Sequence, residues 1–315
     1  PHNMKIFLEL IEPHAIIFTK FDLWPGIIFS AYKSNIPLYL ISATLHQNSL
    51  RIRNFFGRIL YKKINSCFKG IYCSSEIDKI NFSINAPNCL NLKVLGDTRI
   101  DNVLQRSKNI CEYKFSSSGN KVFIAGSIWP EDADHIFTGT INALRHDGKF
   151  VTILTFHEGS EKNFSRIESF FEEFNIIKLS EVKEVIPDEF RVIINDKLGI
   201  LASLYEIGDI AYIGGGFTTG VHNVMEPCIK GIPTIFGPKY KNAPEVVGLV
   251  KSEYGFTINQ EEEFNKIIHD FTENPKHYKQ LGDLSKNYVY TLSGASERCF
   301  NEIYQDLKNV ENALY

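Results

Sequence analysis

The chain has 315 residues, of which 43% are hydrophobic and 23% are charged. This is the composition of a folded globular protein, and the length corresponds to about two domains of ~100–200 residues. The net charge of −3 supplies no overall basic field, so the sequence argues against duplex nucleic acid as a partner. The apolar runs are short and interrupted, and none approaches the ~20 residues of a membrane span.

The spacing of the cysteines and histidines argues against a bound metal. The six cysteines are spread along the chain without a CxxC pair, so we interpret them as reduced thiols of a reducing compartment. Several histidines stand singly, without the i, i+4 partner that suits a metal, and we interpret them as solvated or structural. They are His14, His46, His135, His146 and His269. The sequence predicts neither a metal nor another cofactor.

The first part of the chain predicts a parallel sheet. It opens with Pro1 in "PHNMKIFLELIEPHAIIF", which reads as the middle of a fold, so we expect the natural N-terminus to lie upstream. Strands with continuous apolar, β-branched character are buried on both faces, which is typical of parallel sheets. Such runs, bounded by turn signals, occur at 15–19, 37–43, 70–75 and 92–96.

One helical segment between these strands has an unusual composition. In "RIRNFFGRILYKK" at 51–63, basic residues are interleaved with Phe55, Phe56, Ile59 and Leu60. The pattern fits an amphipathic helix that buries its apolar face in the core. It also fits a helix that lies on an anionic membrane surface.

The polar stretch "CEYKFSSSGNK" at 111–121 is the predicted linker. Beyond it, further apolar runs alternate with segments of helical spacing, which predicts doubly wound α/β units. These runs lie at 121–127, 150–156, 191–196, 210–216 and 233–237. We expect an α/β fold with Rossmann-like domains at 1–110 and 111–295. The amphipathic segment at 296–315 is predicted to be a helix that packs back toward the first domain.

A glycine-rich stretch, "YIGGGFTTGVHNVMEPCIKGIPTIFGP" at 212–238, reads as a strand, a turn and a helix. Bare N–H groups and the positive end of a helix dipole suit a phosphate, and ligands of open α/β sheets bind at the carboxyl ends of the strands. The stretch is neither a Walker P-loop nor a clean GxGxxG. The alternative is a tight turn with Asn223 as N-cap and Glu226 in a capping-box variant, which needs no ligand.

Motifs along nearly the whole chain occur in one order. They are "DLWPG" at 22–26, "GDTRIDNV" at 96–103, "AGSIWPEDADHI" at 125–136, "NDKLGILASLY" at 195–205, the glycine-rich turn with "HNVMEP" and "GIPTIFGP", and Glu245. As an ordered set they resemble the 3-deoxy-D-manno-octulosonic acid (Kdo) transferases, GT-B-type glycosyltransferases of lipopolysaccharide assembly. The resemblance implies two Rossmann-like domains with mostly parallel sheets that face a cleft.

The resemblance also implies the substrates. The C-terminal domain would bind the donor CMP-Kdo without a metal ion, and the N-terminal domain would bind a lipid A precursor (lipid IVA) as acceptor. Asn223 and Glu226 would contact the CMP part, the glycines would bring backbone amides to the phosphate, and His157 would meet the base. The implied donor-site residues are Phe156, His157, Leu198, Gly199, Ile200, Gly214, Gly215, Gly216, Asn223, Val224, Met225 and Glu226.

The implied reaction is an inverting, metal-independent transfer. Cleavage develops positive charge on the sugar and negative charge on the phosphate, so the site needs anion stabilisation and a base for the acceptor hydroxyl. By resemblance, Asp22 and Arg99 would stabilise this transition state. The alternative for Asp22 is a helix cap before Trp24. The alternative for Arg99 is a surface ion pair with Asp97 or Asp101.

The catalytic base of the family is a Glu in a region that would precede Pro1. A complete Rossmann-like domain has on the order of 150 residues, so we expect the N-terminal domain to be incomplete here and the chain alone to be inactive. The resemblance places the enzyme at the cytoplasmic face of the inner membrane, peripheral or anchored through an upstream segment. Departures from the family pattern leave open a divergent donor or acceptor preference; they include Asp22, Asn102, Ile128, Phe156 and Ile200.

Two other functions stay open on the sequence. One is a sugar-nucleotide epimerase of the same architecture, in which Glu158 and His222 could serve as acid and base. The other is a degenerate, non-catalytic module that binds a nucleotide sugar.

Overall fold

The computed structural model describes residues 2–46, 49, 53–86, 89, 91–108, 110–241 and 243–313. The chain divides into two compact units: Pro1–Asn102 with Leu292–Tyr315 (unit 1), and Val103–Thr291 (unit 2). It passes from unit 1 to unit 2 within helix α6 (Thr98–Arg106). The stretch at 111–121 is therefore no linker between the units. Its strand β5 (Lys114–Phe115) pairs in parallel with β9 (Val185–Ile186) inside unit 2.

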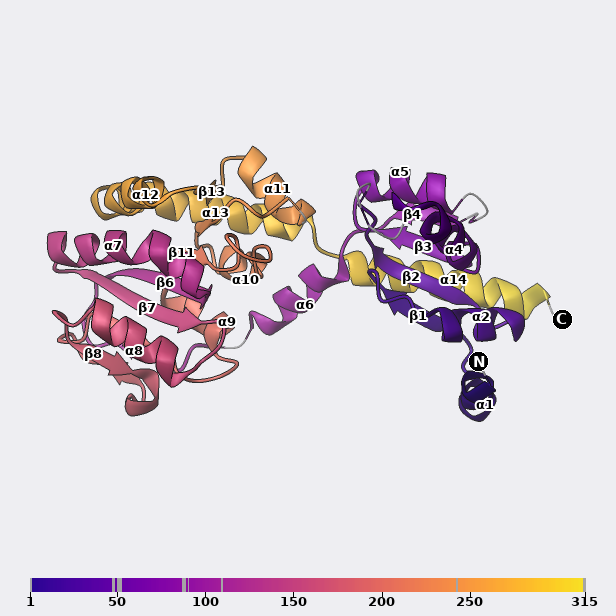
Figure 1. Cartoon of the computed structure of the whole chain (residues 1–315), viewed down its shortest axis with the longest axis horizontal. Coiled ribbons are helices and arrows are strands. Elements are labelled where there is room, and N and C mark those ends of the chain that lie inside the picture. Colours follow the sequence, from indigo (N-terminus) through magenta and orange to yellow (C-terminus); the bar gives the residue numbers. More distant parts are fainter. Residues whose placement is uncertain are drawn as a thin grey trace. The chain divides into compact units, whose positions relative to one another are not determined.

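Unit 1 is built on a four-stranded parallel sheet in the order β1-β2-β3-β4 (Figure 1). The strands are β1 (Ile16–Thr19), β2 (Leu38–Ala43), β3 (Gly70–Cys73) and β4 (Asn91–Val94), and the helices are α1 (His2–Ile11), α2 (Pro25–Lys33), α4 (Phe55–Asn65), α5 (Glu76–Asn85), α6 and α14 (Ala295–Ala313). Leu40 and Ile71 of the central strands are fully buried. The hydroxyl of Tyr39 donates to Asp306 of α14 at 2.6 Å, which helps to hold this helix on the sheet.

Unit 2 is built on a seven-stranded parallel sheet in the order β13-β12-β11-β6-β7-β10-β8. The strands are β6 (Lys121–Ile128), β7 (Phe150–Phe156), β8 (Ile176–Lys178), β10 (Val192–Ile194), β11 (Ile210–Ile213), β12 (Thr234–Phe236) and β13 (Gly255–Thr257). The helices are α7 (Pro130–His146), α8 (Glu161–Phe170), α9 (Leu201–Leu204), α10 (Met225–Ile229), α11 (Pro244–Lys251), α12 (Glu261–Glu273) and α13 (Pro275–Thr291), with 3-10 turns at Leu179–Glu181 and Tyr205–Ile207.

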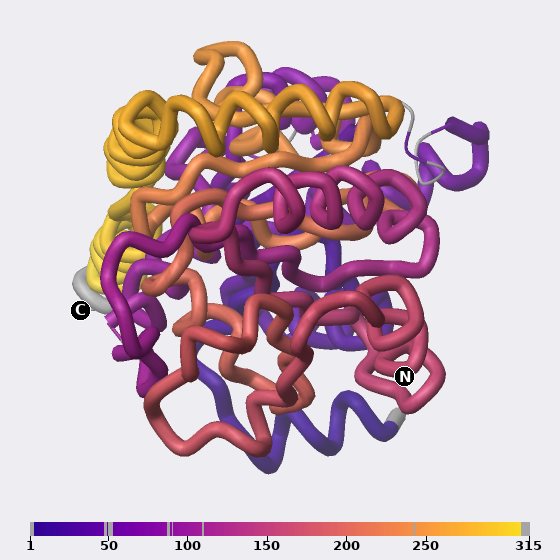
Figure 2. Tube along the Cα trace, turned by 90° about the vertical axis from the view of Figure 1, so that its left-hand side faces the viewer, coloured from indigo at the N-terminus to yellow at the C-terminus, as the bar shows by residue number. Residues whose placement is uncertain are grey.

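Helix α7 is the central helix of one layer of unit 2. The ring of Phe137 meets the ring of Phe171, just after α8, with 5.1 Å between centroids. On its other side α7 lies beside α12 in both views (Figure 1, Figure 2). Each apolar run predicted as a strand forms one, so the predicted α/β fold with mostly parallel sheets is confirmed.

Helix α4 buries Ile64 near its end but leaves the four apolar residues singled out in the sequence exposed. Asn54 caps it by accepting from the amide of Gly57 at 2.5 Å. Phe55 and Phe56 are 71% and 83% exposed, and Ile59 and Leu60 are exposed as well. The predicted burial of these four side chains is therefore wrong, although Ile64 of the same helix packs into the core of unit 1. No helix in the described part of the chain combines the length and apolar character needed to cross a bilayer.

Candidate functional site

The glycine-rich turn after β11 is shaped by close backbone packing. A Cβ at Gly214 would collide with the carbonyl oxygen of Ser127, and one at Gly216 would lie 2.5 Å from the amide nitrogen of Gly237. Gly215 has a φ of 90°, which favours glycine. The amide of Gly214 donates to Gly126 and that of Gly215 to Asp132, at 2.9 and 2.8 Å. These two amides are therefore unavailable to a phosphate in this structure, contrary to the sequence-based expectation.

The buried carboxylate of Asp132, near the start of α7, ties the turn to the end of β6. Its Oδ1 accepts from the hydroxyl of Tyr212 at 2.7 Å, and its Oδ2 accepts from the amides of Gly215 and Trp129 at 2.8 and 2.9 Å. Burial and the neighbouring Asp132 raise the pKa of Tyr212, so its hydroxyl stays a donor at neutral pH. Hydrogen-bond partners of this kind make a buried charge tolerable.

Three flat side chains stack at the carboxyl ends of β6 and β7. The ring of His157 lies 4.7 Å from Trp129 and 4.5 Å from His222, nearly parallel to both. The indole N–H of Trp129 donates to Nε2 of His222 at 2.9 Å. Because an indole nitrogen only donates, His222 accepts at Nε2 and carries its proton on Nδ1. Burial lowers the pKa of His222, His157 lowers it further and Asp132 opposes them, so the ring is neutral at pH 7.

A cavity of about 650 Å³ in unit 2 brings together three of the predicted donor residues, Gly199, Ile200 and Glu226. Its lining comprises Arg106, Ile110, Glu112, Tyr113, residues 199–203 and Glu226. The side-chain amide of Asn223 donates to Oε1 of Glu226 at 2.9 Å, and Asn223 Oδ1 accepts from Met225. The Asn–Glu pair is thus hydrogen-bonded, although Val224 and not Asn223 is the N-cap of α10. Burial raises the pKa of Glu226, while Asn223 and the charge of Arg106 oppose the rise.

Other predicted donor residues lie outside this cavity. The side chains of Val224, Met225 and Phe156 are buried in unit 2, so they pack in the interior and present no surface to a ligand. Leu198 is 92% exposed and does not line the cavity, and His157 belongs to the aromatic stack. The motif positions were found from the sequence, but several of them have structural roles in this fold.

In unit 1, a second cavity of about 690 Å³ opens at the carboxyl ends of β1 and β2 and includes Arg99. Nε and Nη2 of Arg99 donate to Oδ2 of Asp97 at 2.9 and 2.7 Å, which is one of the pairings considered on the sequence. Asp101 instead accepts from the amides of Gly294 and Ser296 at the start of α14. Asp22 lies exposed outside this cavity, and the N-cap of α2 is Trp24 and not Asp22.

Sequence reasoning missed Arg106, Tyr113, Asp132 and Trp129 as members of these sites. Tyr113 lies within the stretch interpreted as a linker, and Arg106 lies shortly before it, so no predicted strand or motif included either residue. Trp129 and Asp132 stand in the quoted "AGSIWPEDADHI" motif, directly after a strand. That position, at the carboxyl end of a parallel strand, was the available signal.

Comparison with known proteins supports the motif-based resemblance. Residues 1–102 match the family model for "3-Deoxy-D-manno-octulosonic-acid transferase (kdotransferase)". The chain is 21% identical over 313 residues to the Kdo transferase of Chlamydia trachomatis, covering 97% of this chain and 70% of that protein. It is 26% identical over 277 residues to the Aquifex aeolicus Kdo transferase, covering 84% and 67%. A bifunctional glycosyltransferase/methyltransferase of Fusobacterium nucleatum is 26% identical over 277 residues, covering 83% of this chain and 41% of that protein.

Solved structures support the fold. A UDP-GlcNAc 2-epimerase from Neisseria meningitidis superposes with a TM-score of 0.68 at 15% identity, covering 96% of this chain and 79% of that one. At this identity the likeness shows the fold alone. The Kdo transferases named above are related in sequence, whereas the epimerase is similar in fold alone, so an epimerase role is not favoured. The ordered motifs, the family model over residues 1–102 and these relatives agree that the chain is similar to the Kdo transferases.

Proposed function

We propose that this protein is a glycosyltransferase that transfers Kdo from CMP-Kdo to a lipid A precursor in lipopolysaccharide biosynthesis. The observation that carries the proposal is the Glu226 cavity. It collects Gly199, Ile200 and Glu226, three implied donor residues, from two separate segments of the chain. Its volume of about 650 Å³ is in the range of ordinary small-molecule sites.

The lining of the cavity suits a cytidine nucleotide. The carboxylate of Glu226 can accept hydrogen bonds from ribose hydroxyls, and Asn223 holds one of its oxygens in place. Arg106 supplies a cation for the phosphate. Gly199, with a φ of 80°, and Ile200 form the turn before α9, where backbone groups can meet the base. The set combines anion binding with hydroxyl recognition.

The proposed mechanism is an inverting displacement without a metal ion. As the bond from the sugar to the phosphate breaks, charge grows on the leaving phosphate, and fixed cations stabilise it. Arg99 is our candidate for a transition-state stabiliser in unit 1, with its guanidinium oriented by two hydrogen bonds to Asp97. Asp22, at the turn after β1, is the second candidate, and its carboxylate would stabilise the positive charge that grows on the sugar.

The first test is binding of CMP. We expect isothermal titration calorimetry to show that Glu226→Ala weakens CMP binding by about 10- to 100-fold, because hydrogen bonds to a charged group contribute about 1.5–3 kcal/mol. The matched control is Glu172→Ala, an exposed carboxylate elsewhere in unit 2, which should leave binding unchanged. Equal CMP affinity in wild type and Glu226→Ala, or no binding by folded wild type, would remove this cavity as the donor site.

We also propose that the protein works at the cytoplasmic face of the inner membrane, with α4 on the lipid surface. Phe55, Phe56, Ile59 and Leu60 are exposed on α4, which also carries Arg58, Lys62 and Lys63. Ile77, Ile80 and Ile84 of the adjoining α5 are exposed too. Apolar side chains beside basic ones are the pattern of helices that rest on anionic membranes. Such a surface would keep the enzyme beside a lipid acceptor.

The membrane proposal predicts a lipid preference. Wild type should sediment with phosphatidylglycerol vesicles more strongly than with phosphatidylcholine vesicles, and the double variant Arg58→Ser/Lys62→Ser should lower partitioning about 30-fold, since each basic residue contributes about 1 kcal/mol. Phe55→Ser/Phe56→Ser should lower it at least tenfold. Leu284→Ser, an exposed apolar residue of unit 2, serves as control and should have no effect. The proposal would be contradicted if vesicle binding were the same for both lipids and were unchanged in the α4 variants.

A further inference from the structure

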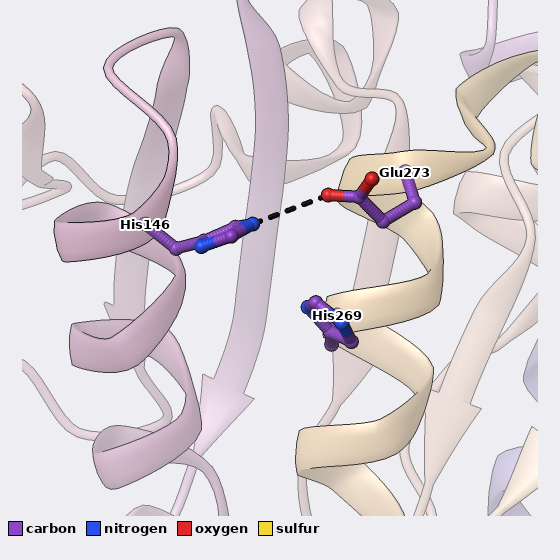
Figure 3. Close-up of side chains that lie close together, drawn as sticks. All are labelled: His146, His269 and Glu273. Carbon is purple, nitrogen blue, oxygen red and sulfur yellow. Dashed lines mark hydrogen bonds and ion pairs between the residues drawn. The ribbon is translucent and has the colours of Figure 1, made fainter.

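Two histidines and a glutamate from two helices converge at one edge of unit 2 (Figure 3). His146 is the last residue of α7, and His269 and Glu273 lie four residues apart on the last turns of α12. One ligand atom of each residue lies within 4.8 Å of the other two. Nε2 of His146 is 3.2 Å from Oε1 of Glu273, and the centroids of the two imidazole rings are 5.3 Å apart. All three side chains are exposed and can exchange an ion with solvent.

We propose that His146, His269 and Glu273 form a binding site for a divalent transition metal ion of the Zn²⁺ class. Two imidazoles and one carboxylate are a donor set that suits zinc, and water would complete the coordination. Ligands at about 2.0–2.2 Å around a tetrahedral ion lie about 3.3 Å apart. The contact between His146 and Glu273 already has this separation, and modest side-chain rotations would bring in His269.

The surrounding structure favours a cation here. Both α7 and α12 end at the cluster, so the negative ends of two helix dipoles point toward it. The nearby ammonium of Lys121 is paired with Asp147 at 2.7 Å, which reduces its repulsion of a metal. Each ligand stands on a regular helix, and the two helices are packed against each other. Their backbones therefore hold the ligands in place before an ion arrives.

A small cavity of about 280 Å³ continues from the cluster between the helices. His146 and His269 line it together with Asn265, which lies one turn before His269 on α12. Oδ1 of Asn265 is buried and has no hydrogen-bond partner among the described residues. Gly139 of α7 permits this close approach, since a Cβ there would collide with that oxygen. The space beside the ligands can hold water that links Asn265 to the coordination shell.

The site is separate from the proposed donor cavity. Helix α7 begins beside Trp129 at the carboxyl end of β6, and its 17 residues carry the chain about 25 Å to His146. The ion would therefore act as a clamp between the ends of α7 and α12, with no part in sugar transfer. Sequence spacing missed this site because the i+4 partner of His269 is a glutamate, and His146 comes from another helix.

Zinc binding to the untagged protein tests the proposal. Calorimetry with Zn²⁺ should show a site that His269→Gln and Glu273→Gln each weaken at least tenfold, while His277→Gln, an exposed histidine of α13, binds as wild type does. Zn²⁺ should also raise the melting temperature of wild type and His277→Gln but not of the two ligand variants. Equal affinity in all four proteins, or no binding to wild type, would overturn the proposal.

The cysteines require a separate control, because thiolates also bind zinc. Co²⁺ should therefore replace Zn²⁺ in a spectroscopic titration. Imidazole and carboxylate ligands give d–d bands without thiolate charge transfer, and these bands should disappear in His146→Gln. A thiolate charge-transfer band that survives in His146→Gln would assign the metal to cysteines and overturn the proposal.

Discussion

Asp132→Ala is expected to destabilise unit 2 by about 4 kcal/mol. The substitution leaves the hydroxyl of Tyr212 and the amides of Gly215 and Trp129 without their acceptor, and each buried unpaired group costs about 1–3 kcal/mol. Two units need not unfold together, so the measurement needs a local probe. Urea unfolding followed by Trp129 fluorescence in a Trp24→Phe background reports unit 2 alone.

The matched control is Asp134→Ala on the same helix. Asp134 is exposed and paired with Arg166, so its loss should change stability by less than about 1 kcal/mol. The loss of stability in Asp132→Asn should lie between those of Asp132→Ala and Asp134→Ala. The amide oxygen of the new side chain can still accept a hydrogen bond, but its NH₂ group would face a donor. Similar midpoints for Asp132→Ala and Asp134→Ala would show that the buried hydrogen bonds contribute little.

Gly214→Ala is expected to cost about 3 kcal/mol, measured with the same fluorescence probe. The new methyl group would collide with the carbonyl oxygen of Ser127 in β6, a strand paired with β11, and would approach Oδ2 of the buried Asp132. Overpacking of this kind forces a backbone shift.

Gly148→Ala separates this steric effect from the general effect of replacing glycine. Gly148 lies in the turn between α7 and β7, and apart from its chain neighbours no heavy atom of the described residues lies within 4 Å of a Cβ placed there. This control should be neutral or stabilising by up to about 1 kcal/mol, because alanine restricts the unfolded chain. A loss of stability as large as that of Gly214→Ala would show that backbone entropy, and not the Ser127 contact, accounts for the glycine.

Most strands of the two sheets can be predicted from local sequence patterns. Long apolar runs such as "KVFIAGS" and "FVTILTF" predict β6 and β7, because a strand buried on both faces needs continuous apolar side chains. β8 and β13 were not predicted from the sequence. Each lies at an edge of the sheet and is only partly buried, so it lacks the fully buried apolar run that marks the equally short β10 and β12.

For the candidate sites, local sequence patterns left the role of individual residues open. For the glycine-rich turn, the sequence allowed phosphate binding and tight packing together, and the contacts of Gly214 and Gly215 show the packing. For Arg99, the sequence allowed a catalytic cation and an ion pair. The structure shows the pair with Asp97 and also places Arg99 in a cavity, so the two descriptions are compatible.

The sequence by itself determined the α/β class, the positions of the main strands along the chain and the resemblance to Kdo transferases, because these depend on local hydrophobic patterns and on motifs that are contiguous in the chain. Only the tertiary structure joined Glu226 to Arg106 in one cavity, and His146 to His269 and Glu273 at one helix edge. These residues come from elements far apart in sequence. Their contact depends on strand order and helix packing, which local spacing does not encode.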